Sequence, residues 1–128
     1  MNAPATFDPD KWRRVTQRRN PDMDVEDRIV ATLVADLLAH NADWHIAVMD
    51  GEEIVTQPMR DAATIMAALF STDEDYLQIH FTKPAPKESA HAWVRLIGGN
   101  GCDIVSDYTT NIPDVVFERS NAIAAEYH

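Results

Sequence analysis

The stretch from Tyr76 to Thr82 alternates strictly between polar and apolar side chains, and this pattern constrains the fold more than any other feature of the chain. A period of two residues is typical of a strand that buries one face and leaves the other in water. Parallel sheets are covered on both faces, so half-buried strands belong mainly to antiparallel sheets. The pattern therefore predicts an antiparallel sheet with one face against a core.

Two hairpins are predicted to supply the other strands. The first turns at Asp50-Gly51, a dipeptide that type I′ turns favour because both central residues have positive φ. The second turns at the glycine-rich segment 98–101. The strands expected are Trp44–Met49, Glu53–Gln57, Tyr76–Thr82, His91–Ile97 and Cys102–Tyr108.

Three helices are predicted around these strands. Apolar residues recur at three- and four-residue steps from Val25 to Leu38, which gives one broad apolar face with Asp27 and Thr32 on the other side. The first helix is expected to run from Pro21 or Asp24 to His40 after an Asn20 cap, the second to begin after Pro58, and the third to begin after an Asn111 cap.

The resulting order is αββαβββα, and it predicts an α+β fold. We expect a single antiparallel sheet of about five strands with helices packed on one face, because βαβ units are absent. Residues 21–128 have the length of one domain. Residues 1–20 lack periodicity, carry prolines and arginine pairs, and are predicted to form a flexible basic N-terminal arm anchored by Trp12. We call residues 1–20 the arm throughout.

Charge is unevenly distributed along the chain. The net charge is −10, from 11 basic and 21 acidic residues. Residues 1–23 hold five basic and three acidic residues, so the acidic excess lies wholly in the remainder. An acidic body repels nucleic acid and anionic membranes and attracts basic partners. The sequence also has no apolar run of signal-peptide or membrane-helix length, and its one cysteine cannot form an internal disulfide. We therefore expect a cytoplasmic protein with no membrane contact.

Two clusters of polar residues are candidate binding surfaces. Acidic residues crowd the first hairpin turn and the loop before Tyr76, where their structural role would be to form turns and protect strand edges. A polar run joins the last strand to the last helix, a position where free N–H groups often meet ligands. The first candidate comprises Asp50, Glu52, Glu53, Asp73, Glu74 and Asp75, and the second Asp103, Asp107, Tyr108 and Asn111.

Histidine and cysteine give no predicted metal or catalytic centre. No histidine pair has the four-residue spacing of a helical zinc motif, although His80 and His91 are expected on adjacent strands. Cys102 is interpreted as a small buried residue of a strand. We expect no cofactor and no bound metal.

Three segments resemble a group of short uncharacterised bacterial and phage- or plasmid-encoded proteins. They are DGEE at 50–53, STDED at 71–75 and GGNGCDIVSDYT at 98–109. The resemblance extends from Ile46 to the C-terminus and excludes the arm. It implies an accessory role and transfers no activity or catalytic residue.

The leading hypothesis is a non-catalytic acidic binding module that engages another macromolecule, with a basic protein as partner. A more specific form of this hypothesis is an inhibitor that occupies the nucleic-acid site of a basic partner, with its carboxylates in the place of phosphates. The first alternative is a small hydrolase or transferase that uses the second candidate surface. The second alternative is a nucleic-acid-associated protein that uses the arm. An open sheet face bearing Tyr76 and Trp93 would also suit a homodimer. The arm residues in question are Trp12, Arg13, Arg14, Arg18 and Arg19.

Overall fold

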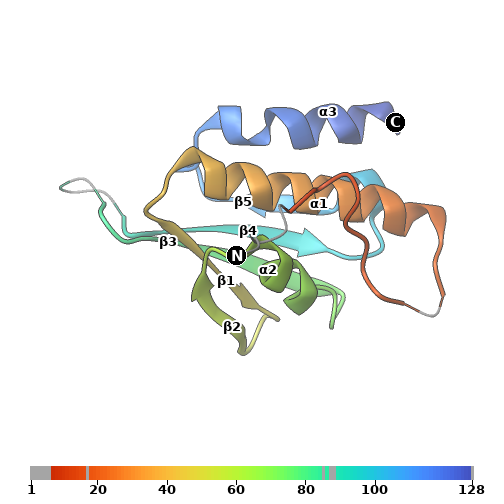
Figure 1. Cartoon of the computed structure of the whole chain (residues 1–128), viewed down its shortest axis with the longest axis horizontal. Coiled ribbons are helices and arrows are strands. Elements are labelled where there is room, and N and C mark those ends of the chain that lie inside the picture. The colour runs from red at the N-terminus through yellow and green to blue at the C-terminus, as the bar shows by residue number, and fades with distance from the viewer. Residues whose placement is uncertain (1–6, 17, 85, 87–88, 128) are drawn as a thin grey trace, which may run out of the picture.

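The structure is a computed structural model in which three helices lie against one five-stranded sheet (Figure 1). It describes residues 7–16, 18–84, 86 and 89–127. The predicted arm thus falls partly outside the described residues, at residues 1–6 and 17. No helix in these described ranges is both long and apolar enough to cross a membrane. The elements are α1 (Pro21–His40), β1 (Trp44–Met49), β2 (Ile54–Met59), α2 (Ala62–Ala68), β3 (Glu74–Phe81), β4 (His91–Ile97), η1 (Gly101–Asp103), β5 (Val105–Tyr108), η2 (Asp114–Phe117) and α3 (Glu118–Glu126).

The sheet is antiparallel at every pairing, with the strand order β2-β1-β3-β4-β5. Its centre is the predicted alternating strand, since β3 pairs with β1 on one side and with β4 on the other. The α+β class and the order αββαβββα are confirmed.

One face of the sheet and the helices share a single core. Ile46, Leu77 and Val94 stand on neighbouring strands and are fully buried, and they belong to the same apolar cluster as Leu33 and Leu37 of α1. The alternate residues of the strands, such as Tyr76 and Trp93, are only half-buried or exposed. The helices therefore cover one face and leave the other open, as the alternation predicts.

Helix α1 begins and ends with specific polar contacts. Asn20 accepts a hydrogen bond from the Met23 N–H at 3.1 Å, and Pro21 occupies the first helical position, so the predicted cap is confirmed. At the other end the Arg60 guanidinium donates to the carbonyl of Leu38 at 2.7 Å and to that of Trp44 at 2.5 Å. The bond to Leu38 satisfies a carbonyl that the helix end leaves open, and the bond to Trp44 connects the start of β1 to the same guanidinium.

Two predictions about the first hairpin are wrong. A type I′ turn requires a positive φ at Asp50. Among the described residues, Phe70 is the only residue other than glycine with a positive φ, so the turn at Asp50 is not of type I′. Instead Asp50 accepts bonds from two backbone N–H groups of a four-residue turn. Pro58 does not open a helix, because β2 continues to Met59. Its missing N–H costs little there, since β2 is an edge strand.

The second hairpin and the last helix also differ from the prediction. The predicted strand Cys102–Tyr108 begins only at Val105, because Gly101–Asp103 forms a 3₁₀ turn. Asp103 and Asp107 therefore do not share one strand. Asn111 does not cap α3, which is preceded by η2. The Asn111 side chain instead donates to the His91 carbonyl at 2.9 Å, so it ties the chain to β4.

Candidate functional site

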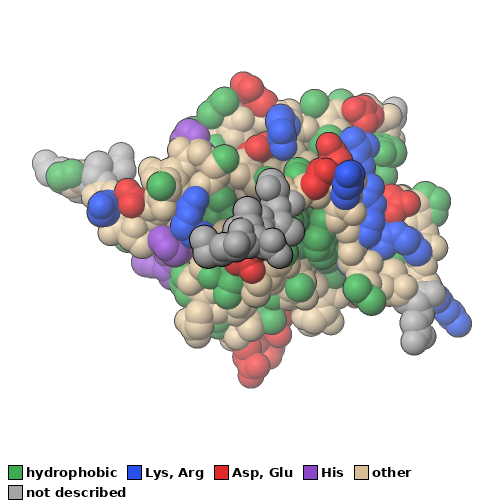
Figure 2. Space-filling view, viewed as in Figure 1, with side chains coloured by type: hydrophobic (Ala, Val, Ile, Leu, Met, Phe, Trp, Pro, Cys, Tyr) green, Lys and Arg blue, Asp and Glu red, His purple; other side chains and the backbone are tan. Residues whose placement is uncertain are grey.

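The β1–β2 turn places carboxylates at one end of the sheet. The Asp50 carboxylate accepts from the N–H of Glu53 at 2.9 Å and from that of Glu52 at 3.2 Å. These bonds, led by that from Glu53, hold the pKa of Asp50 below its ordinary value because they stabilise the charged form. Glu52 and Glu53 are exposed. Figure 2 shows acidic side chains protruding at the lower edge of the molecule, where the β1–β2 hairpin ends in Figure 1.

The three acidic residues Asp73, Glu74 and Asp75, at the start of β3, have different surroundings. Asp73 is exposed, while its carbonyl accepts from the Gly98 N–H at 2.7 Å. Glu74 pairs with Arg95 at 3.1 Å on the open sheet face, and this contact lowers the pKa of Glu74. Asp75 is 2% exposed and accepts from the Phe70 N–H at 3.1 Å.

The pKa of Asp75 connects this loop with the β1–β2 turn. Burial raises the pKa of Asp75, and the negative charges of Asp50 and Asp73 raise it further. The β1–β3 register pairs Met49 with Tyr76, so the β1–β2 turn and the start of β3 lie at the same end of the sheet. We call Asp50, Glu52, Glu53 and Asp73 the acidic end of the sheet.

Most arginine side chains bind groups of the same chain. Six form ion pairs with the chain's own carboxylates, and Arg60 binds backbone carbonyls at the end of α1. The carboxylates of the acidic end are not among those that these arginines pair with in the described part of the chain. The six are Arg13, Arg14, Arg19, Arg28, Arg95 and Arg119.

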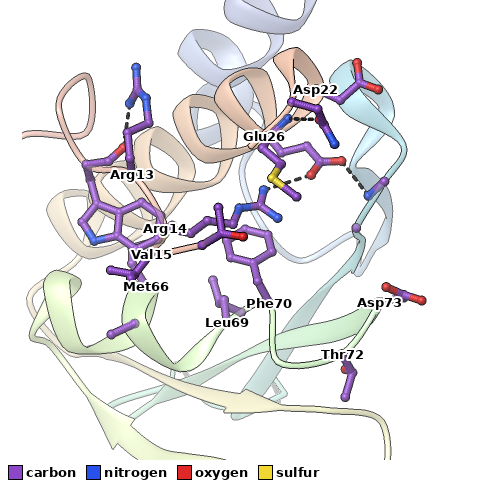
Figure 3. A pocket seen from close by; sticks show the side chains of 17 residues that line it. Arg13, Arg14, Val15, Asp22, Glu26, Met66, Leu69, Phe70, Thr72 and Asp73 are labelled. Atoms are coloured by element: carbon purple, nitrogen blue, oxygen red, sulfur yellow. Dashed lines mark hydrogen bonds and ion pairs between the residues drawn. The ribbon is translucent and has the colours of Figure 1, made fainter. Parts of the chain in front are cut away.

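The arm lies against α1, and arginines attach it there (Figure 3). Arg14 donates to Glu26 at 2.9 Å and to Asp27 at 2.7 Å, and its backbone N–H also donates to Asp27 at 3.1 Å. Arg19 binds Asp27 as well and binds Asp24 at 2.7 Å. In Figure 2 blue and red side chains alternate over the N-terminal half of α1. Arg18 is exposed, and Trp12 packs against the core.

Glu26 and Asp27 were not predicted as functional residues. The helical pattern puts Asp27 on the polar side of α1, yet Glu26 is 1% and Asp27 0% exposed because the arm covers them. The Glu26 carboxylate also accepts from the N–H groups of Gly99 at 2.7 Å and Gly101 at 2.9 Å. The glycine-rich turn thus binds the Glu26 carboxylate through its backbone N–H groups. Two adjacent acidic residues facing two arginine pairs were the sequence signal for this contact.

A cleft of about 530 Å³ opens beside this contact. The arm contributes Trp12 and Val15 to its wall, α1 contributes Glu26, and the end of α2 and the following turn contribute Met66 and Phe70 (Figure 3). Its lining is both apolar and charged. The predicted acidic residue Asp73 lies on the same wall as Gly98 and Gly99.

The predicted junction residues are brought together only in part. Asp103 and Tyr108 line a second cleft of about 290 Å³ with Cys102, which is half-buried in η1. Asp107 turns its carboxylate to the Tyr108 N–H at 2.8 Å. Neither Asp107 nor Asn111 lines that cleft among the described residues. The four groups therefore do not converge on one point.

Three histidines form a row across the open sheet face. The sheet register pairs His45 with His80 and His80 with His91. The ring centroids of His80 and His91 are 4.7 Å apart in an edge-to-face arrangement. Burial lowers the pKa of His80, and the charges of its two neighbours lower it further. Within the described ranges, no group of three or more His, Cys, Asp or Glu side chains is placed to hold a metal ion.

The fold and these surfaces define a small α+β protein with one open antiparallel sheet, an acidic end and an arm bound to its first helix. No protein-family model, curated protein or solved structure matches the chain.

Proposed function

We propose that the chain is a non-catalytic binding module that engages a basic partner protein through the acidic end. One observation carries this proposal. The β1–β3 register pairs Met49 with Tyr76, so the exposed carboxylates of Glu52, Glu53 and Asp73 share one end of the sheet. Outward carboxylates that repel one another are stabilised when a cationic surface binds them.

The distribution of arginine side chains supports the same proposal. The field outside the molecule is negative because the chain has 21 acidic and 11 basic residues, and six arginines are already paired with its own carboxylates. A negative field accelerates association with a positively charged surface and slows the approach of nucleic acid. The arm is a weaker candidate for nucleic acid, since Arg13, Arg14 and Arg19 are bound to α1.

The enzymatic alternative has less support. It requires Asp103, Asp107, Tyr108 and Asn111 to act on one substrate. Asp107 is bonded to a backbone N–H and Asn111 to the His91 carbonyl, while the other two line a cleft. Binding by the acidic end therefore remains the conclusion.

Affinity capture from host lysate at low and high salt tests the proposal. The bait is the full chain, compared with the variant E52Q/E53Q/D73N. These three residues are exposed, whereas Asp50 is left intact because it holds the turn together. We expect the full chain to retain a basic protein at low salt and to lose it at high salt, because salt screens exposed charges. The variant should fail to retain it.

A matched control separates a local surface from overall charge. The variant D10N/D114N/E118Q removes the same number of exposed carboxylates from other parts of the chain. We expect it to retain the partner. Equal loss of the partner by both variants would show that binding depends only on net charge. Retention of the partner by E52Q/E53Q/D73N would refute the acidic end as the binding surface.

A further inference from the structure

The contact between the arm and α1 has the construction of a recognition site for arginine. Arg14 lies between two carboxylates that are almost fully buried, and it binds Glu26 at 2.9 Å and Asp27 at 2.7 Å. Its guanidinium carbon also lies 3.8 Å from the centroid of the Phe70 ring. A planar cation over an aromatic face, with carboxylates at its edge, is the arrangement by which proteins select arginine over lysine. We call Glu26, Asp27 and Phe70 the arginine slot.

Contacts outside the arm also hold the slot in place. Gly99 and Gly101 donate to the Glu26 carboxylate from the opposite side. Phe70 has a positive φ of 69°, and its N–H donates to the buried Asp75. A positive φ at an aromatic residue is strained, and surrounding contacts must hold it. The slot is thus preorganised by α1, the turn after α2 and the glycine-rich turn.

The carboxylates of the slot need a cation. Among the described residues, the side-chain donors to Asp27 are Arg14 and Arg19, and both come from the arm. Removing a cation from buried carboxylates leaves an uncompensated charge, which is strongly unfavourable. Because the arm itself covers both carboxylates, its departure exposes them to water, and a guanidinium from another segment would restore the same contacts over Phe70.

The arm presents features of a bound peptide as well as those of a structural segment. Val15 follows Arg14 directly and is fully exposed, although it borders the cleft of about 530 Å³. Thr16, Arg18 and Arg19 are exposed too. The arm is therefore attached mainly through Arg14, Arg19 and Trp12, and the cleft lies beside it.

We infer that the arginine slot is a binding site for an arginine-bearing segment of a partner protein, and that the chain's own arm occupies this site until the partner displaces it. The inference rests on the proposed function, since the acidic end would attract the same basic partner. It adds the chemistry of recognition, namely a guanidinium between Glu26 and Asp27 above Phe70. The arm then acts as an internal competitor.

A titration with a labelled peptide tests the inference. The probe has the sequence of residues 7–20, and its binding to the full chain is measured by fluorescence anisotropy. The tethered arm competes at an effective concentration in the millimolar range, so we expect weak binding to the unaltered chain. The variant R14A/R19A removes the competing side chains, and we expect it to bind the peptide at least about tenfold more tightly.

The matched control is R13A/R18A, which removes two arginines of the same arm that lie outside the slot. It should bind the peptide as the unaltered chain does. Adding E26Q to R14A/R19A should abolish the gain, and a peptide with alanine at both slot positions should not bind. Equal peptide affinity for R14A/R19A and R13A/R18A would overturn the inference.

Two further measurements keep the test decisive. If R14A/R19A does not fold, the peptide should restore its circular dichroism signal and cooperative melting, and no restoration would overturn the inference. The variant E52Q/E53Q/D73N leaves the slot intact, so introducing it into R14A/R19A should preserve peptide binding even if the acidic end has no partner. Failure of the slot and failure of the acidic end are thereby distinguished.

Discussion

The guanidinium of Arg14 lies 3.8 Å above the ring of Phe70, a residue whose backbone has a positive φ of 69°. The two residues are far apart in the chain, and each is held from its other side by a buried carboxylate. Glu26 and Asp27 bind Arg14, and Asp75 binds the Phe70 N–H. The attachment of the arm and the strained turn after α2 therefore stabilise each other.

We expect Arg14→Ala to lower the free energy of unfolding by about 3 kcal/mol, because it leaves buried carboxylates without their main cation. Arg13→Ala is the control. Arg13 pairs with Asp24 at 3.5 Å, and the two side chains are 33% and 51% exposed, so its loss should cost no more than about 0.5 kcal/mol. Urea denaturation measures both values. Equal losses would show that the Arg14 contact is no stronger than a surface ion pair.

Substituting Gly101 by alanine should destabilise the glycine-rich turn. Gly101 has a φ of +59°, and a Cβ there would lie 3.2 Å from a carboxylate oxygen of Asp22. The left-handed conformation alone costs a side chain about 1–2 kcal/mol. Gly98→Ala is the control, since its Cβ would make an ordinary 3.5 Å contact with the Asp73 carbonyl. Thermal melting should show a clear loss for Gly101→Ala and almost none for Gly98→Ala.

The raised pKa of Asp75 gives stability a specific dependence on pH. Burial disfavours the charged carboxylate in the folded chain, so the folded pKa exceeds the unfolded one. Its contribution is therefore fully present below the unfolded pKa and is lost as pH rises through the folded pKa. Asp75→Asn should remove this loss while keeping an acceptor for the Phe70 N–H. We expect the stability difference between variant and unaltered chain to shift in favour of Asn as pH rises from about 4 to about 7.

Because the pKa values of Asp50 and Glu74 are lowered, their contributions run in the opposite direction. The comparison must therefore be made as a difference between the two chains at each pH. If the stability difference between Asp75→Asn and the unaltered chain did not change with pH, the raised pKa of Asp75 would be contradicted.

The histidine row should be visible in a titration by nuclear magnetic resonance. Burial, then the charges of His91 and His45, lower the pKa of His80. His91→Gln removes one of these charges and should raise the pKa of His80 towards its ordinary value. His40→Gln lies outside the row and should leave it unchanged. The depressed pKa also means that the contribution of His80 to stability is present above its unfolded pKa and is lost as pH falls.

The sheet and the first helix were predictable because their signals are local. The alternation around Leu77 and Ile79 located the central strand, and the Asn20-Pro21 pair located the start of α1. The turns were harder. From the sequence, Pro58 indicates the end of a strand, but a proline is tolerated in β2 because this strand lies at the edge of the sheet. Asn111 indicates a helix cap, but in the structure its side chain binds β4.

The arginine slot could not be derived from one helix alone. The period of α1 puts Asp27 among polar residues, and only the arm, which has no periodicity, buries it. The donors to Glu26 come from the glycine-rich turn, for which the sequence predicts only a hairpin connection. Contacts between segments so distant in sequence leave no periodic signal in either one.

The bonds from Gly99 and Gly101 to Glu26 also fix an order of events during synthesis. Glu26 leaves the ribosome early, whereas its donors are separated from it by 73 and 75 positions and follow only after most of the chain has been made. Until then the Glu26 carboxylate is hydrated by water, and α1 lacks its contact with the glycine-rich turn. A prematurely terminated chain that ends before the glycine-rich turn would lack both donors to Glu26, so its first helix would stay without this contact.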